Sequence, residues 1–136
     1  MKAGIIGLSL AGKSTLFQLL TGSPSPLPGS RPEVRLGVAT VPDPRVQALA
    51  DIFHPKKKTW ATVEYVDVPG VTRGHGSTLV DLPALRAVDA LVHVVRAFDS
   101  KTAPHPEGSI DPLRDAGVLD LELILADLAT VERRIE

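Results

Sequence analysis

The sequence contains no cysteine and no asparagine, and it has only two glutamines. Without cysteine the chain can form neither a disulfide framework nor a thiolate metal site. The shortage of thermolabile residues, together with 12 prolines, fits a protein from a thermophile. A genome rich in G and C favours Ala, Arg, Pro and Gly and explains the same composition, so both interpretations stay open.

A strong net charge and long apolar runs are also absent. The net charge at pH 7 is −1, so no basic field argues for nucleic acid as a partner. No apolar run approaches the roughly 20 residues that span a bilayer. Glycines and Lys13 interrupt the N-terminal apolar run, so no signal-peptide pattern forms. With 136 residues, the chain is predicted to be one compact domain of a cytoplasmic protein without a membrane partner.

Short apolar segments alternate with segments of helical periodicity. Strands are predicted at residues 2–6, 37–41, 60–68 and 89–98. Helices are predicted at residues 13–20, 44–53, 78–88 and 111–136. This alternation predicts an α/β layered fold with a largely parallel sheet. One apolar stripe on the last helix is predicted to pack in the core or against a hairpin partner: Leu121, Ile124, Leu125, Leu128, Val131 and Ile135.

A glycine-rich turn separates the first predicted strand from the first predicted helix. Its residues 7–14, GLSLAGKS, fit the P-loop pattern G-x-x-x-x-G-K-S/T in full. The two glycines let successive backbone N–H groups converge on phosphate oxygens. Lys13 is predicted to supply charge to the β- and γ-phosphates and Ser14 to bind Mg²⁺. An ordinary glycine-rich turn is the alternative. The predicted phosphate-binding residues are Leu8, Ser9, Leu10, Ala11, Gly12, Lys13, Ser14 and Thr15.

A second motif, VEYVDVPG, lies at the end of the third predicted strand. A nucleotide site of this kind needs an acid there to hold Mg²⁺ through water, and Asp67 is predicted to be that acid. An ordinary turn residue is the alternative for Asp67. Gly70 is predicted to let a backbone N–H approach the γ-phosphate, and it forms the predicted catalytic set together with Lys13.

With these two motifs the chain resembles P-loop GTPase-class proteins, and more narrowly the YchF family of the Obg-like group. PDPR at residues 42–45 and HVVRAF from His93 are the most family-specific pieces. The resemblance implies a three-layer P-loop fold, slow Mg²⁺-dependent hydrolysis of ATP or GTP, and a role linked to the ribosome or to translation. The segments that carry it are GIIGLSLAGKSTLFQLLTG, VPDPRVQALADIF, VEYVDVPGV, RAVDALVHVVRAFD and LELILADLATVERRIE.

The resemblance does not settle which base is read. The family tends to prefer ATP over GTP because its base-reading motif departs from N-K-x-D. This chain has no asparagine and no T-K-x-D, so it has a base-reading motif of neither kind. Ras-type enzymes carry a water-orienting glutamine after D-x-x-G, whereas this chain has Val71 there, and the family is similar in having an apolar residue. Slow hydrolysis is therefore expected.

Three features depart from the family pattern. Arg31, beside Ser30, stands where a switch threonine normally closes on Mg²⁺. The long glycine-rich second switch is shortened to RGHGS, and the sequence ends where a helical hairpin would begin. Residues 1–136 are therefore predicted to be a partial nucleotide-binding domain, incomplete at its C-terminal side, in which residues 111–136 lead toward a missing hairpin. Either the sequence is a fragment or the protein is a naturally shortened relative. The rival prediction is a non-catalytic interaction module that has lost its switch and base-reading motifs.

The other conspicuous side chains have ordinary interpretations beside functional ones. His75 could orient water and Arg73 could offset phosphate charge, yet both fit a solvated loop. The lysine triplet at 56–58 fits a solvated turn, since no aromatic residues interleave with it. His93 is predicted to be a core histidine and Trp60 to pack on the sheet. The four histidines lack metal-ligand spacing, which argues against a zinc site.

Overall fold

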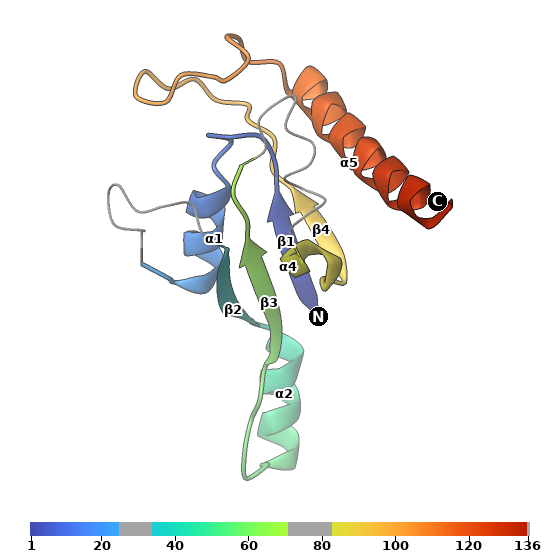
Figure 1. The fold of residues 1–136 in the computed structure, drawn as a ribbon. Coiled ribbons are helices and arrows are strands. Elements are labelled where there is room, and N and C mark those ends of the chain that lie inside the picture. The colour runs from blue at the N-terminus through green and yellow to red at the C-terminus, as the bar shows by residue number, and fades with distance from the viewer. Residues whose placement is uncertain (25–33, 71–82, 136) are drawn as a thin grey trace.

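The computed structural model describes residues 1–24, 34–70 and 83–135 (Figure 1). Its sheet has four strands in the order β2-β3-β1-β4. The predicted α/β fold with a mostly parallel sheet is confirmed, and one edge strand is antiparallel. The parallel strands are β1 (Lys2–Ile6), β3 (Ala61–Asp67) and β4 (Ala90–His93), and the antiparallel one is β2 (Arg35–Val41), which pairs with β3.

The central strand β1 is buried because both faces of the sheet are covered. Its residues 3–6 are all buried, which is why this strand reads as a continuous apolar run. In the register of the sheet, Ala3 lies between Tyr65 of β3 and Ala90 of β4. Because β1 and β3 are parallel, their carboxyl ends lie at the same edge of the sheet. The P-loop and Asp67 follow these two ends.

Helices lie on opposite faces of the sheet (Figure 1). On one face α1 (Lys13–Thr21) packs closely on β2, since a Cβ at Gly37 would lie 2.8 Å from Cζ of the buried Phe17. On the other face lie the short α4 (Pro83–Arg86) and the long α5 (Pro112–Ile135). The core between this face and α5 is formed by Ile6, Leu8, Val66, Val68 and Leu119.

Helix α2 (Pro44–Phe53) projects beyond the end of the sheet and has no buried residue (Figure 1). It begins as its sequence predicts, because the Asp43 carboxylate accepts a hydrogen bond from the Arg45 backbone N–H at 2.9 Å and Pro44 follows at the first position. It ends at His54, whose backbone is left-handed with φ of 48°. An apolar group of Leu49, Ile52 and Phe53 is exposed on it.

The lysine triplet in the turn after α2 is exposed, as the solvated-turn interpretation predicts. The Lys58 ammonium lies 4.9 Å from the centroid of the Trp60 ring and bonds to the Gln47 side chain. Trp60 directly precedes β3 and is half-buried, and its indole packs against this lysine of the triplet.

Two predicted elements are shorter in the structure. Strand β4 ends at His93 instead of Phe98: the Val94 N–H still donates to the Ile6 carbonyl at 2.8 Å, and the chain then leaves the sheet. His93 is half-buried rather than a core residue. The helix predicted at 78–88 is described only from Pro83 as α4, because residues 78–82 lie outside the described residues. The other described boundaries agree with the predictions within two residues.

The apolar stripe predicted on the last helix lies on the exposed face of α5. Leu121 is 54% exposed and Ile124 is 61% exposed. The buried positions of α5 are instead Asp115, Leu119, Glu122 and Ala126. The core interpretation of the stripe is therefore wrong, and the hairpin interpretation stays a prediction. None of the helices in the described part of the chain has the length and apolar character of a membrane span.

Candidate functional site

The P-loop turns tightly between β1 and α1 through left-handed backbone. The φ angles are 152° at Gly7, 62° at Leu10 and 97° at Gly12. A Cβ at Gly7 would lie 2.3 Å from the Val94 carbonyl oxygen, so this position has neither the space nor the conformation for a side chain. Gly12 is the N-cap of α1 and provides no side-chain hydrogen bond. The first N–H groups of α1 therefore face the loop without a side-chain cap, which is the usual arrangement for an anion site.

Lys13 is the first residue of α1, and its side chain folds back over the loop. Nζ donates a hydrogen bond to the Leu8 carbonyl at 2.7 Å, and the side chain is buried. Burial lowers the pKa of Lys13 below its usual value of 10.5, while the negative charge of Asp67 raises it in part. A buried ammonium is stabilised by a nearby negative charge, and a phosphate group would supply that charge.

Gly70 lies directly against the P-loop. A Cβ at this position would be 2.6 Å from Ser9 Cα and 2.8 Å from both Ser9 Oγ and Lys13 Nζ. Only a residue without a side chain allows this approach. The structure therefore brings together Gly70, Ser9 and Lys13, which are about 60 residues apart in the sequence.

The buried acid at the end of β3 has an unused oxygen. The Asp67 carboxylate is buried, and its Oδ2 lies 3.9 Å from Arg35 Nη1. Asp67 Oδ1 has no hydrogen-bond partner among the described residues. Leaving a buried acceptor unsatisfied is unfavourable, and Mg²⁺ or its bound water would satisfy it. Ser14 is exposed on the first turn of α1, and its hydroxyl is a second oxygen donor of the kind that fits Mg²⁺.

The remaining predicted P-loop residues divide by exposure. Leu8 and Ala11 are buried and anchor the loop, whereas Leu10 and Thr15 are exposed. A backbone contact closes the turn, since the Ala11 N–H donates to the Leu8 carbonyl at 3.3 Å. The apolar side chains at positions 8 and 11 therefore hold the loop while its backbone stays available.

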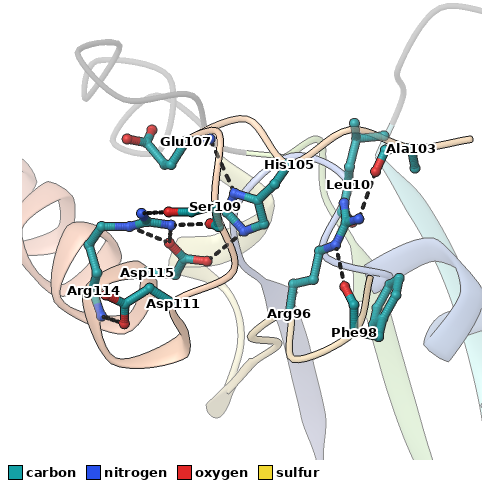
Figure 2. Close-up of polar contacts among 10 residues, drawn as sticks. All are labelled: Leu10, Arg96, Phe98, Ala103, His105, Glu107, Ser109, Asp111, Arg114 and Asp115. Carbon is teal, nitrogen blue, oxygen red and sulfur yellow. Dashed lines mark hydrogen bonds and ion pairs between the residues drawn. The ribbon is translucent and has the colours of Figure 1, made fainter. Parts of the chain in front are cut away.

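A buried arginine that the sequence did not identify as a site residue supports the P-loop (Figure 2). Arg96 donates to the carbonyls of Ala103 at 2.6 Å and Phe98 at 3.0 Å, and more weakly to that of Leu10 at 3.5 Å. Its guanidinium also lies 4.8 Å from the Phe98 ring centroid. A Cβ at Gly12 would be 3.9 Å from that ring, so Arg96 holds the segment after β4 beside the P-loop. Arg96 lies in the HVVRAF segment, and that segment was the sequence signal that could have identified it.

A second polar cluster fastens the following segment to the start of α5 (Figure 2). His105 Nε2 and Asp115 Oδ2 are 2.8 Å apart, and both side chains are buried. The Glu107 N–H donates to His105 Nδ1 at 3.1 Å, so in the neutral ring Nε2 carries the proton. Arg114 donates to the other oxygen of Asp115 at 2.8 Å. The groups of this cluster satisfy one another.

Several residues of the predicted switches cannot be placed. Arg31 and Ser30 lie outside the described residues, as do Val71, Arg73 and His75. The expectations about both switches therefore remain predictions. No group of three metal-ligating side chains occurs within residues 1–24, 34–70 and 83–135.

Known proteins match this chain over nearly its whole length. A family model described as 50S ribosome-binding GTPase matches residues 2–121. The Ribosome-binding ATPase YchF of Bacillus subtilis is 41% identical, over 99% of this chain and 39% of that protein. The Obg-like ATPase 1 of Schizosaccharomyces pombe is 37% identical, over 100% of this chain and 37% of that protein.

A solved structure agrees with these sequence matches. The structure of the Schizosaccharomyces pombe YchF GTPase superposes with a TM-score of 0.66 and 32% identity, over 98% of this chain and 38% of that one. The chain thus spans about two fifths of the length of the relatives it matches.

Proposed function

We propose that this chain, which belongs to the 50S ribosome-binding GTPase family, binds ATP or GTP with Mg²⁺ at its P-loop and hydrolyses the nucleotide slowly. One observation carries the proposal. Gly70, which has no room for a side chain, and the buried Lys13 ammonium converge on a P-loop whose glycines have positive φ angles. Family membership supports nucleotide binding, and the geometry of these residues supports the P-loop as its place.

Each residue of the site then has a physical role. The N–H groups of residues 8–15 hold the phosphates, and Lys13 exchanges its bond to the Leu8 carbonyl for a phosphate oxygen. The Ser14 hydroxyl and the unsatisfied oxygen of Asp67 would hold Mg²⁺. When bound, Mg²⁺ offsets charge that develops on the transferred phosphoryl group. Gly70 lets its backbone approach the γ-phosphate because no side chain intervenes.

The relatives suggest a partner for this activity. The Bacillus subtilis and Haemophilus influenzae proteins are both named as ribosome-binding ATPases. We extend the proposal to the ribosome or another translation component as partner, which places the protein in the cytoplasm. The rival function, a non-catalytic interaction module, is favoured by the exposed Leu49, Ile52 and Phe53 on α2.

Single-turnover phosphate release with Mg²⁺-ATP and with Mg²⁺-GTP separates these two functions. Enzymes of this class turn over at about 10⁻⁴ to 10⁻² per second without a partner, and we expect this chain at or below the low end of that range. Valine at position 71 cannot orient water, and Arg31 replaces the switch threonine. The Lys13→Ala variant should release no phosphate above buffer.

Two results would contradict the proposed activity. A rate of about 1 per second without a partner would show a complete catalytic apparatus, since that approaches the rate of partner-activated enzymes. Equal background release from the wild type and Lys13→Ala would instead favour the interaction module.

A further inference from the structure

We propose that Arg35 is a built-in counter-cation for Asp67, and that nucleotide binding by this chain therefore depends only weakly on Mg²⁺. The inference rests on the proposed nucleotide binding and adds to it a residue that controls the metal requirement. It is drawn from the antiparallel edge of the sheet, where β2 pairs with β3 and Arg35 is the register partner of Asp67.

The guanidinium of Arg35 is held beside the carboxylate by three contacts. Its Nη2 donates to the Pro24 carbonyl at 2.8 Å. Its Cζ lies 4.8 Å from the centroid of the buried Phe17 ring. Its Nη1 lies 3.9 Å from Asp67 Oδ2. The guanidinium thus contacts the Phe17 ring through Cζ and the Pro24 carbonyl through Nη2, while Nη1 faces the acid.

The ion pair between Arg35 and Asp67 leaves one polar atom of each side chain without a hydrogen bond in the described part of the chain. Neither Arg35 Nη1 nor Asp67 Oδ1 has a hydrogen-bond partner in the described part of the chain, and both atoms are buried. A separation of 3.9 Å is an ion pair but is too long for a direct hydrogen bond. Burial keeps the attraction from being screened by solvent. Asp67 Oδ1 can therefore still bind a ligand, and the positive charge of Arg35 then acts on that ligand.

A cation lies beside Asp67 before any metal arrives, since Arg35 Nη1 is 3.9 Å from Asp67 Oδ2. This ion pair offsets part of the carboxylate charge, and it therefore lowers the attraction of Asp67 for a divalent cation. By linkage, the ratio of nucleotide affinity with and without Mg²⁺ should be small.

The experiment is calorimetric titration of the whole chain with ADP and with GDP, in EDTA and in saturating Mg²⁺. The measured quantity is the ratio of the dissociation constant in EDTA to that in Mg²⁺. We expect a wild-type ratio below about tenfold, and a ratio about tenfold higher in Arg35→Gln, which corresponds to about 1.4 kcal/mol. Arg35→Lys keeps the charge and should keep the ratio near the wild-type value. Arg134→Gln removes an exposed arginine of α5 and should leave it unchanged.

The possible failures are distinguishable. Absence of nucleotide binding by the wild type in either buffer would overturn the proposed function and this inference with it. Binding with the same ratio in the wild type and Arg35→Gln would overturn the role of Arg35 alone. This includes the case in which both affinities fall together, because Arg35 would then contact phosphate directly. If Arg35→Gln fails to fold, a wild-type ratio above about tenfold overturns the inference by itself.

Discussion

At the scale of single residues, this site depends on positions where a side chain would collide with the backbone. Gly7 faces the Val94 carbonyl and Gly70 faces Ser9 and Lys13. The first glycine belongs to a recognisable pattern, so its place in the site could be predicted from the sequence. The contacts of Gly70 could be predicted only as a general approach to phosphate, because they depend on how β3 and β1 lie side by side. A close approach between distant segments has no local sequence signal.

Gly70→Ala should weaken both the fold and nucleotide binding. The new Cβ would overlap Ser9 Cα at 2.6 Å and Lys13 Nζ at 2.8 Å, so the P-loop must shift. Such overpacking costs about 1–3 kcal/mol in free energy of unfolding. Urea unfolding and ADP titration measure the two effects.

The matched control is Gly117→Ala on α5, where a Cβ would meet nothing within 4 Å. That substitution should stabilise the chain by about 0.5–1 kcal/mol, because alanine favours the helix interior. If Gly70→Ala bound ADP as tightly as Gly117→Ala does, the close approach of Gly70 to the P-loop would be irrelevant to binding.

At the scale of elements, periodicity identified the helices but not the face that each one buries. Residues 121, 124, 125, 128, 131 and 135 form the more apolar stripe of α5, yet the structure buries the neighbouring face around Leu119. The sequence could not show this, since Asp115 and Glu122 on the buried face look like surface residues until their partners are known. The end of β4 was missed in the same way. VVRAF has strand propensity, yet β4 ends at His93 and Arg96 bonds to loop carbonyls instead.

Truncation to alanine should therefore change the free energy of unfolding by very different amounts at a buried and at an exposed position of α5. Leu119→Ala removes a fully buried side chain from the core and should cost about 2–5 kcal/mol in free energy of unfolding. Ile124→Ala lies on the exposed stripe and should change stability by no more than about 0.5 kcal/mol. Chemical denaturation of both variants measures the difference. Comparable losses would mean that α5 buries its apolar stripe after all.

At the scale of the whole molecule, the site exists because parallel strands end at one edge of the sheet. The P-loop follows β1 and Asp67 ends β3, so parallel pairing brings them together, and this much was foreseeable from the motifs. Arg35 was not foreseeable, because its position beside Asp67 depends on the antiparallel pairing of β2. Fold class and phosphate site follow from short local patterns, whereas the electrostatic environment follows from strand pairing.

The most direct test of the phosphate site is titration of the chain with a fluorescent nucleoside diphosphate, comparing the wild type with Lys13→Ala. The control is Lys57→Ala, which removes an exposed lysine of the triplet. We expect Lys13→Ala to lose at least about a hundredfold in affinity, or about 2.8 kcal/mol, while Lys57→Ala binds like the wild type. The fold should persist, since the Leu8 carbonyl keeps its bond from the Ala11 N–H. Equal affinity in a folded Lys13→Ala variant and the wild type would contradict phosphate binding at this loop.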